Sequence, residues 1–464
     1  MGNMNNSGVD IGNRGRRRIA MTGKDWRSRV AFIVGVVVIC LGVLGLREVR
    51  AVDLEMAPIR YWDGELNDPF AKLQRRVESG EVSLKSGSTR GVVMKLLEAL
   101  SIPVESQVMV YSKTSAQNSR IYPKWPRAIY YSDDAYVGWV QGGAVEVLTF
   151  DPERGAIFYL LDPGVSPGER EPQWSRPQTC LNCHGTTPSS GVPGGLVRSV
   201  FPGRDGMPFF QMGTFATDDT SPLENRWGGW YVTGKPGGHR HMGNALAVEE
   251  KEGIELVPMV RNAEYLLDLS EVIDTTPYPA GGSSDIVALM VMEHQIRLHN
   301  ILNHANLSVR QLDHRTREMY ENLGEPIPDE PTGALKRVIA SQAEKIVKAL
   351  LFTDEFPLKG DGVEGNNAFR NAFLRTRRPS EDDRSLKDFR LYERIFKYRC
   401  SYVIYSDVFR SLPELVKSEV FRLLHTGLKA RNGTGLTGHL STSERARIFR
   451  ILGETHPDIP EYWH

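Results

Sequence analysis

The chain contains 464 residues, and its 57 lysines and arginines are balanced by 57 aspartates and glutamates. This balance argues against a protein built to bind the phosphate backbone of a nucleic acid, which would need a basic excess. Hydrophobic residues make up 40% of the chain and charged residues 25%, a composition that predicts a folded globular protein and excludes a disordered one. Four cysteines, Cys40, Cys180, Cys183 and Cys400, are too few for a scaffold held together by disulfides.

The first 51 residues have the features of an export signal. The charged residues within 1–29 are predominantly basic. Val30–Leu46 follows as the only long apolar run of the chain, and a single run excludes a polytopic membrane protein. Val49 and Ala51 place a cleavage site after Ala51, but the apolar run is also long enough to stay in the bilayer. We therefore expect residues 1–51 to be a signal peptide or an N-terminal membrane anchor. The rest of the chain should lie on the periplasmic side, anchored or secreted.

Residues 52–283 predict a mixed, β-rich domain. Val92–Leu100 has apolar residues at helical spacing. Four short runs with a period of two follow, separated by turn-forming residues, and they predict a four-stranded antiparallel meander. These runs are Ala128–Tyr131, Tyr136–Val140, Ala144–Phe150 and Ala156–Leu161.

Two further strand pairs are expected later in this domain. Leu196–Phe201 and Met207–Phe215 flank an Asp-Gly turn, which is a hairpin signal. Trp230–Thr233 and His239–Met242 flank a glycine-rich turn in the same way. Both pairs fit a predominantly antiparallel fold.

Residues 284–464 predict a helical domain. Ser283 or Ser284 is a candidate cap for a helix that runs to about Leu312. Further helical patterns cover 335–350, 386–411, 414–429 and 442–452, and the glycine-rich, charged stretch 359–383 predicts a long surface loop. The expected fold class is therefore α+β, with an antiparallel β-rich, haem-bearing domain followed by a helical C-terminal region.

The haem prediction comes from Cys180-Leu181-Asn182-Cys183-His184, which has the C-x-x-C-H spacing of c-type haem attachment. Two thiols three residues apart on one tight turn can each form a thioether with one porphyrin vinyl group. The histidine that follows then supplies the proximal iron ligand. Attachment of this type takes place outside the cytoplasm, in agreement with the export signal. One such motif predicts one covalent haem c.

Other chemistry could use the same residues. A bare C-x-x-C also occurs in thiol–disulfide enzymes, although Pro188 opposes the long helix that such a site requires. Zinc could be bound by Cys180 and Cys183 with two of His184, His239 and His241. A coincidental motif without a ligand is the third alternative.

The role of a haem would depend on its sixth iron ligand, because a His or Met there gives an electron carrier and an open position allows ligand binding or peroxide chemistry. His241 is the first candidate, because its glycine-rich flanks let the backbone approach a flat cofactor. Met242 and His294 are the alternatives. Arg240 could pair with a haem propionate, and Trp230 could cover a porphyrin edge.

Several runs of the sequence resemble a family of exported bacterial proteins known as cytochrome c domain-containing and common in planctomycete-like genomes. The runs are Ser112–Ser115, Tyr136–Gly143, Cys180–Gly185, Arg226–Gly234, Arg240–Asn244, Met292–Gln295 and Cys400–Ser406. The resemblance implies a haem c attached at Cys180 and Cys183 with His184 as axial ligand, and implies no substrate. The chain is longer than ordinary class I cytochromes c and is partly β.

The leading functional hypothesis is an exported cytochrome c with a single haem that transfers electrons outside the cytoplasmic membrane to a protein partner that the sequence does not identify. The alternatives are a haem enzyme of the peroxidase or oxidoreductase type, with Arg240 and His241 as distal groups, and a haem-based ligand sensor that signals through the C-terminal helices. The sequence favours a carrier over an enzyme. It predicts no nucleic-acid partner, and contact with the membrane only through an uncleaved N-terminal segment.

Overall fold

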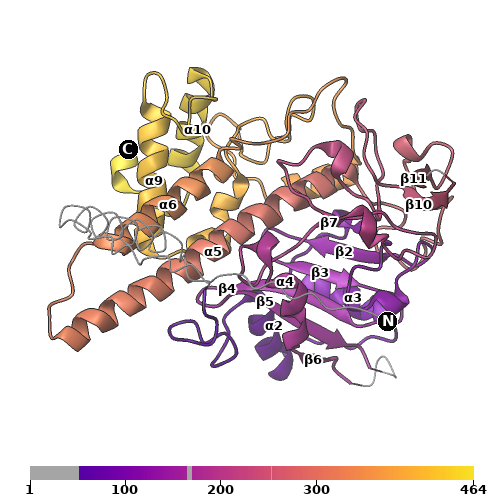
Figure 1. The fold of residues 1–464 in the computed structure, drawn as a ribbon, viewed down its shortest axis with the longest axis horizontal. Helices are drawn as coiled ribbons and strands as arrows, with labels where there is room; N and C mark the ends of the chain where they lie inside the picture. Colours follow the sequence, from indigo (N-terminus) through magenta and orange to yellow (C-terminus); the bar gives the residue numbers. More distant parts are fainter. Residues whose placement is uncertain (1–51, 165–169, 252) are drawn as a thin grey trace, which may run out of the picture. The chain divides into compact units, whose positions relative to one another are not determined.

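The computed structural model describes residues 52–164, 170–251 and 253–464 (Figure 1). Val52–His464 forms one compact unit, which holds both the predicted β-rich part and the predicted helical part. None of the helices in these ranges is long and apolar enough to cross a bilayer. The predicted export signal, with its cleavage site after Ala51, lies outside the described residues.

The core of the fold is a seven-stranded sheet in which all neighbouring strands are antiparallel, in the order β6-β5-β4-β3-β2-β1-β9. The predicted four-stranded meander is confirmed as β2 to β5. Strands at both edges extend the meander in a way that the sequence did not reveal. β6 lies beyond β5, and β1 followed by β9 lies beyond β2. The strands are β1 (Val108–Val110), β2 (Arg127–Tyr131), β3 (Tyr136–Trp139), β4 (Val145–Asp151), β5 (Gly155–Asp162), β6 (Gln173–Ser175) and β9 (Trp230–Tyr231).

One face of the sheet packs against two N-terminal helices, α2 (Pro69–Glu78) and α3 (Thr89–Ala99), which confirms the predicted helix at 92–100. Asp68 caps α2 and also accepts hydrogen bonds from Thr149 and Tyr159 of the sheet, at 2.6 Å each. The helix is therefore fixed to the sheet at its first turn.

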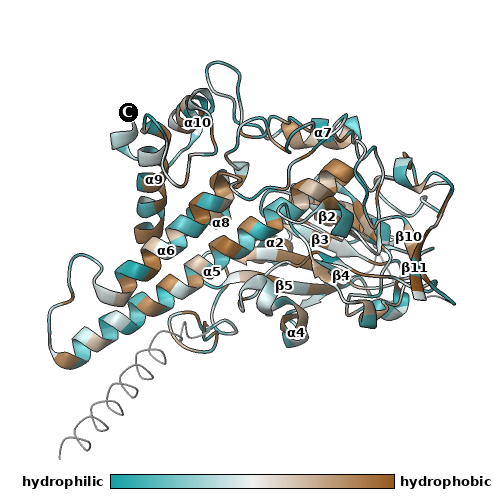
Figure 2. Cartoon of the chain, turned by 45° about the horizontal axis from the view of Figure 1, so that its top comes forward, coloured by the Kyte–Doolittle hydropathy of each residue, from teal (hydrophilic) through white to brown (hydrophobic). Residues whose placement is uncertain are grey.

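The other face packs against α5 (Ile286–Leu323), the longest helix of the described chain, and through it against the C-terminal helices (Figures 1 and 2). The predicted helix is confirmed, but Asp285 caps it instead of Ser283 or Ser284, because the Asp285 carboxylate accepts from the amides of Val287 and Ala288. The first seven residues of α5, Ile286–Met292, are all apolar and buried, and buried polar residues follow them along the helix. The remaining helices are α6 (Gly333–Leu350), α7 (Asn367–Leu374), α8 (Asp407–Arg410), α9 (Glu414–Lys429) and α10 (Thr442–Thr455).

Three predictions about local structure are wrong. Trp230 and Tyr231 pair with β1 at the edge of the main sheet and not with His239–Met242, because this pairing buries both aromatic rings. Residues 386–411 are mostly irregular, with one 3₁₀ turn at Tyr402–Tyr405 and the short α8. The predicted loop 359–383 contains α7.

The predicted hairpin at 196–215 is partly right. It reduces to β7 (Arg198–Ser199) paired with β8 (Phe215–Ala216), and its turn closes through the bond from the Gly203 amide to the Met207 carbonyl, 2.8 Å. A hairpin that the sequence did not reveal follows the segment that holds Arg240, His241 and Met242. It consists of β10 (Ala245–Glu250) and β11 (Gly253–Pro258). The one-turn helix α4 (Leu181–His184) lies between β6 and β7 in the chain.

Candidate functional site

The C-x-x-C-H motif forms a tight helical turn. Cys180 ends a 3₁₀ turn and serves as the residue before α4, and Cys183 and His184 end that helix, which Gly185 terminates. Cys183 is exposed, Cys180 is partly buried, and both are free thiols, as is the fully buried Cys400. A helical turn separates the two thiols by about one turn of backbone, so both can reach one side of the helix.

The imidazole of His184 is held in one orientation. Its Nδ1 donates to the carbonyl oxygen of Gly194 at 2.9 Å, and its ring lies 4.7 Å from the ring of Phe158 on β5. Burial lowers the pKa of His184, so the ring is neutral at pH 7. With the proton on Nδ1, Nε2 carries the lone pair, and within the described ranges it makes no hydrogen bond to the protein. A neutral imidazole whose second nitrogen is fixed by a backbone carbonyl is the form that binds a metal.

Helix α5 positions the carbonyl that orients His184. The Asn300 side chain accepts from the Gly195 amide at 3.0 Å and donates to the Gly195 carbonyl at 2.9 Å. Glycine is required at 194, because a Cβ there would lie 2.3 Å from Asn300 Oδ1. The loop at Gly194 and Gly195 is therefore held to α5 by hydrogen bonds of its backbone to the Asn300 side chain.

The motif lies at the margin of the hydrophobic core. Cys180 and Leu181 of the motif pack against this core and are partly buried, as are Ile129 of β2 and Ile296 of α5. Phe158 retains 9% of its exposure on the same sheet face. The motif therefore lies beside an apolar surface made by the sheet and α5, as a porphyrin plane requires.

A charged pair interrupts this apolar face. The Arg127 guanidinium of β2 crosses Gly138 of β3 and pairs with Glu146 of β4. A Cβ on Gly138 would lie 2.5 Å from Arg127 Nη2, so any larger residue would displace the guanidinium from this position. Burial acts to raise the pKa of Glu146, but Arg127 and the hydrogen bonds from Gln117 and Ser115 outweigh it and lower the pKa.

These residues fit a haem c. The motif supplies two thiols on one helical turn, His184 offers a fixed neutral nitrogen, and the surrounding surface is apolar. The buried Nε of Arg127 has no hydrogen-bond partner in the part of the chain that the structure describes. A buried donor without a partner costs about 1–3 kcal/mol, so an acceptor is expected beside it.

His241, the first candidate for a distal ligand, and the alternative Met242 lie on the segment after β9. Burial lowers the pKa of His241 to about 4, and its Nδ1 accepts from the Gly243 amide at 3.1 Å, so the neutral ring carries its proton on Nε2 and offers iron no lone pair in this arrangement. Its ring packs 5.5 Å from the ring of Trp227. Met242 is buried, and its sulfur accepts from the Ser199 hydroxyl at 3.6 Å.

His294 has both ring nitrogens occupied. Its Nδ1 bonds to Asp219 at 3.0 Å and its Nε2 to the Ser401 hydroxyl at 2.7 Å, and all three residues are fully buried. Burial acts to raise the pKa of the Asp219 carboxylate, but the neighbouring His294 acts against it, and the pKa is lowered to about 2. No nitrogen of this ring is left for iron while the network is intact.

The remaining predicted residues have separate surroundings. Arg240 is exposed, whereas Trp230 is buried and donates from its indole nitrogen to the Arg198 carbonyl at 2.8 Å. His239 accepts from the Lys359 amide at 2.8 Å. Across residues 52–164, 170–251 and 253–464, no three His, Cys, Asp or Glu side chains are arranged to hold a metal ion, so the alternative zinc set is not assembled.

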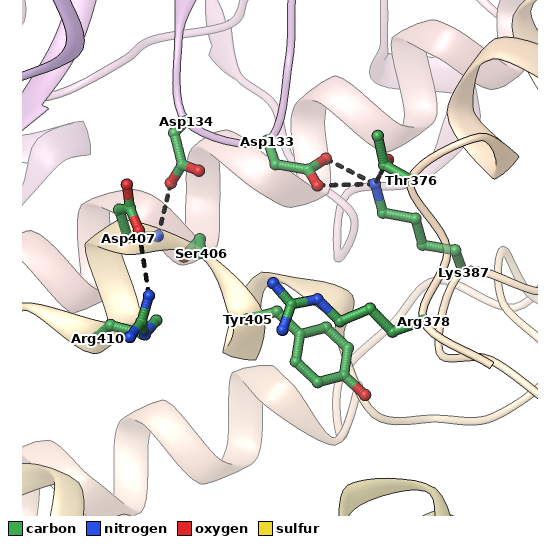
Figure 3. Close-up of a pocket in the computed structure, with 9 residues that line it drawn as sticks. All are labelled: Asp133, Asp134, Thr376, Arg378, Lys387, Tyr405, Ser406, Asp407 and Arg410. Atoms are coloured by element: carbon green, nitrogen blue, oxygen red, sulfur yellow. Dashed lines mark hydrogen bonds and ion pairs between the residues drawn. The ribbon is translucent and has the colours of Figure 1, made fainter. Parts of the chain in front are cut away.

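A separate polar pocket lies where the β2–β3 turn meets the C-terminal helical region (Figure 3). Lys387 donates to both carboxylate oxygens of Asp133 at 2.7 and 2.8 Å, and Asp134 accepts from the Asp407 amide at 2.9 Å. Its lining consists of Asp133, Asp134, Thr376, Arg378, Lys387, Tyr405, Ser406, Asp407 and Arg410. No pattern in the sequence marks this pocket, because its residues come from three distant segments.

The comparisons with known proteins add no assignment: no family model, no curated protein and no solved structure matches this chain.

Proposed function

We propose that this chain is an exported c-type cytochrome with one covalent haem, attached at Cys180 and Cys183, and that it transfers electrons outside the cytoplasmic membrane. The observation that carries the proposal is the orientation of His184, whose Nδ1 is fixed by the Gly194 carbonyl while Nε2 has no partner among the described residues. Alone, a C-x-x-C-H sequence could be a coincidence. A backbone carbonyl that fixes the tautomer of its histidine is the arrangement expected of a ligand.

Different residues of the site would have different roles in holding the haem. Cys180 and Cys183 would bind the porphyrin covalently, His184 would bind the iron, and the apolar side chains around Ile129 and Ile296 would exclude water from one face. When bound, haem c supplies a one-electron Fe(III)/Fe(II) couple. Because Cys183 is exposed, the edge of the site is open to a partner protein, and electrons need no channel through the protein.

The test is maturation of the full chain in a bacterium that attaches haem c in its periplasm. The wild-type protein should carry a haem that survives denaturation, with a pyridine-haemochrome spectrum typical of two thioethers and a mass increase on the peptide that contains Cys180 and Cys183. Cys180→Ser or Cys183→Ser should each remove one thioether. Cys400→Ala is the matched control and should leave the haemochrome spectrum unchanged, because Cys400 is fully buried in the helical region.

A wild-type peptide with two unmodified thiols would contradict the proposal. The visible spectrum of the matured protein separates the carrier from the alternatives. A six-coordinate, low-spin spectrum supports electron transfer, and a five-coordinate spectrum with rapid CO binding supports an enzyme or a sensor.

A further inference from the structure

The ion pair between Arg127 and Glu146 lies on a sheet face that is otherwise apolar. Ile129 and Leu148 share this face. Gly138 of β3 pairs with Ile129 and with Glu146, and strand alternation places Arg127, two residues before Ile129, on the same face. The side chains of Arg127 and Glu146 retain only 21% and 24% of their exposure. Placing two charges there costs solvation energy, which a surface pair would not incur.

The two members of the ion pair differ in the number of their hydrogen bonds. The Glu146 carboxylate accepts three, because Gln117 donates to it at 2.9 Å and Ser115 at 3.1 Å in addition to Arg127. A guanidinium has five N–H donors. Among the described residues, the Arg127 side chain bonds to Glu146 alone, and its Nε is buried without a partner. The carboxylate of Glu146 therefore has its hydrogen-bond donors, whereas the guanidinium of Arg127 keeps unused N–H groups.

The pair also lies beside the haem-attachment motif. The ring of His184 lies 4.7 Å from the ring of Phe158, and Phe158 pairs across the strands with Leu148. Leu148 lies two residues from Glu146 on the same face of β4, so His184 packs on the sheet face that carries the ion pair.

We propose that Arg127 binds a haem propionate through its unused N–H donors, and that Glu146 holds Arg127 across Gly138 in the position for this contact. The inference rests on the proposed function, because the anion is supplied by the haem itself. A carboxylate of this kind is the acceptor that a guanidinium fork fits best. Arg127 is a binding residue in this arrangement, and Glu146 is a positioning residue.

The consequence is a reduction potential that depends on both charges with opposite signs. Reduction adds one negative charge to the haem, so a nearby cation favours the reduced form and a nearby anion opposes it. Arg127→Gln should lower the equilibrium constant for reduction by a fixed mediator about tenfold, which corresponds to ~59 mV for one electron. Glu146→Gln should raise the constant, and the double variant should return toward the wild-type value.

The experiment is a spectroelectrochemical titration of the matured full chain and its three variants. Arg422→Gln and Glu419→Gln form the matched control pair, because these residues form an ion pair on the exposed side of α9. They should leave the potential unchanged. Arg127→Lys keeps the charge and loses the fork, so its potential should lie between those of the wild type and Arg127→Gln.

Potentials that move in the same direction in both single variants, or that do not move, would overturn the inference while covalent haem is still present. A pair with a purely structural role would reduce stability in both variants without this reversal of sign. Absence of covalent haem from the wild type would instead refute the proposed function.

Discussion

At the turn between β2 and β3, two neighbouring aspartates have opposite surroundings. Asp133 faces the ammonium group of Lys387, which is itself buried and would be uncompensated without it. Asp134 faces Asp407 and Asp133, and the pKa of Asp134 is raised to about 7, first by burial and then by these two like charges. The same residue type is therefore stabilising at one position and destabilising at the next.

Asp134→Asn should stabilise the protein, and the effect should depend on pH. Because its folded-state pKa of about 7 lies above its ordinary value of 3.8, Asp134 weakens the fold progressively as pH rises from about 4 to about 7. Asparagine keeps the acceptor for the Asp407 amide and removes the charge. Urea unfolding should show a gain of about 2 kcal/mol at pH 8 and little gain at pH 4.

Asp133→Asn is the paired comparison. It should destabilise the protein by about 2–3 kcal/mol at pH 7, because Lys387 loses the carboxylate that balances its buried charge. Equal effects of the two substitutions would show that the pocket is solvated and that its charges are screened.

At the scale of elements, α5 is the part of the fold that positions the candidate site. Its Asn300 fixes Gly195, and the adjacent Gly194 orients His184. Six residues further along, Asn306 donates to the carbonyl of Pro152 in the β4–β5 turn at 2.9 Å. The helix therefore contacts the loop that follows the C-x-x-C-H motif and the sheet through separate amide side chains.

Asn300→Ala should loosen this loop specifically. The Gly195 amide loses its acceptor and its carbonyl loses its donor, at a cost of about 1–3 kcal/mol. Native-state hydrogen exchange should show faster exchange of the Gly195 amide. Asn306→Ala, on the same helix, should leave that amide protected, and equal exchange in the two variants would mean that α5 does not hold the loop.

Elements defined by local pattern were predictable, and those defined by distant contacts were not. The meander from β2 to β5 consists of short runs rich in β-branched and aromatic residues and closes with short turns, so its strands and their order follow from the sequence. Residues 386–411 have a helical pattern, yet Lys387 bonds to Asp133 and Arg399 to Glu444, and these tertiary contacts replace the helix. Local propensity is a weak signal against such contacts.

The same distinction applies to the site. Cys180, Cys183 and His184 are adjacent in the sequence, and their spacing alone predicts their chemistry. Arg127 and Glu146 meet only through strand pairing across Gly138, so no local motif marks them. The one available signal was a glycine in the middle of a β strand, which indicates close approach of another group.

At the scale of the whole molecule, one buried network joins three parts of the chain. Asp219 follows β8, His294 belongs to α5, and Ser401 belongs to the irregular segment before α8. The ring of His294 also stacks at 4.3 Å on Phe352, which follows α6. The imidazole thus connects the segment after β8, the long helix and the C-terminal region at a single point.

His294→Ala should therefore destabilise the whole Val52–His464 unit by about 3 kcal/mol, because Asp219 and Ser401 are left buried with unmet hydrogen bonds. His314→Ala is the control on the same helix, since His314 pairs only with the exposed Glu318, and its cost should stay below about 0.5 kcal/mol. Urea unfolding of the matured protein measures both. The visible spectrum of His294→Ala should keep its wild-type ligand bands, because neither nitrogen of His294 is free to bind iron. A change from six-coordinate to five-coordinate iron in this variant would show instead that haem binding breaks the network and recruits His294.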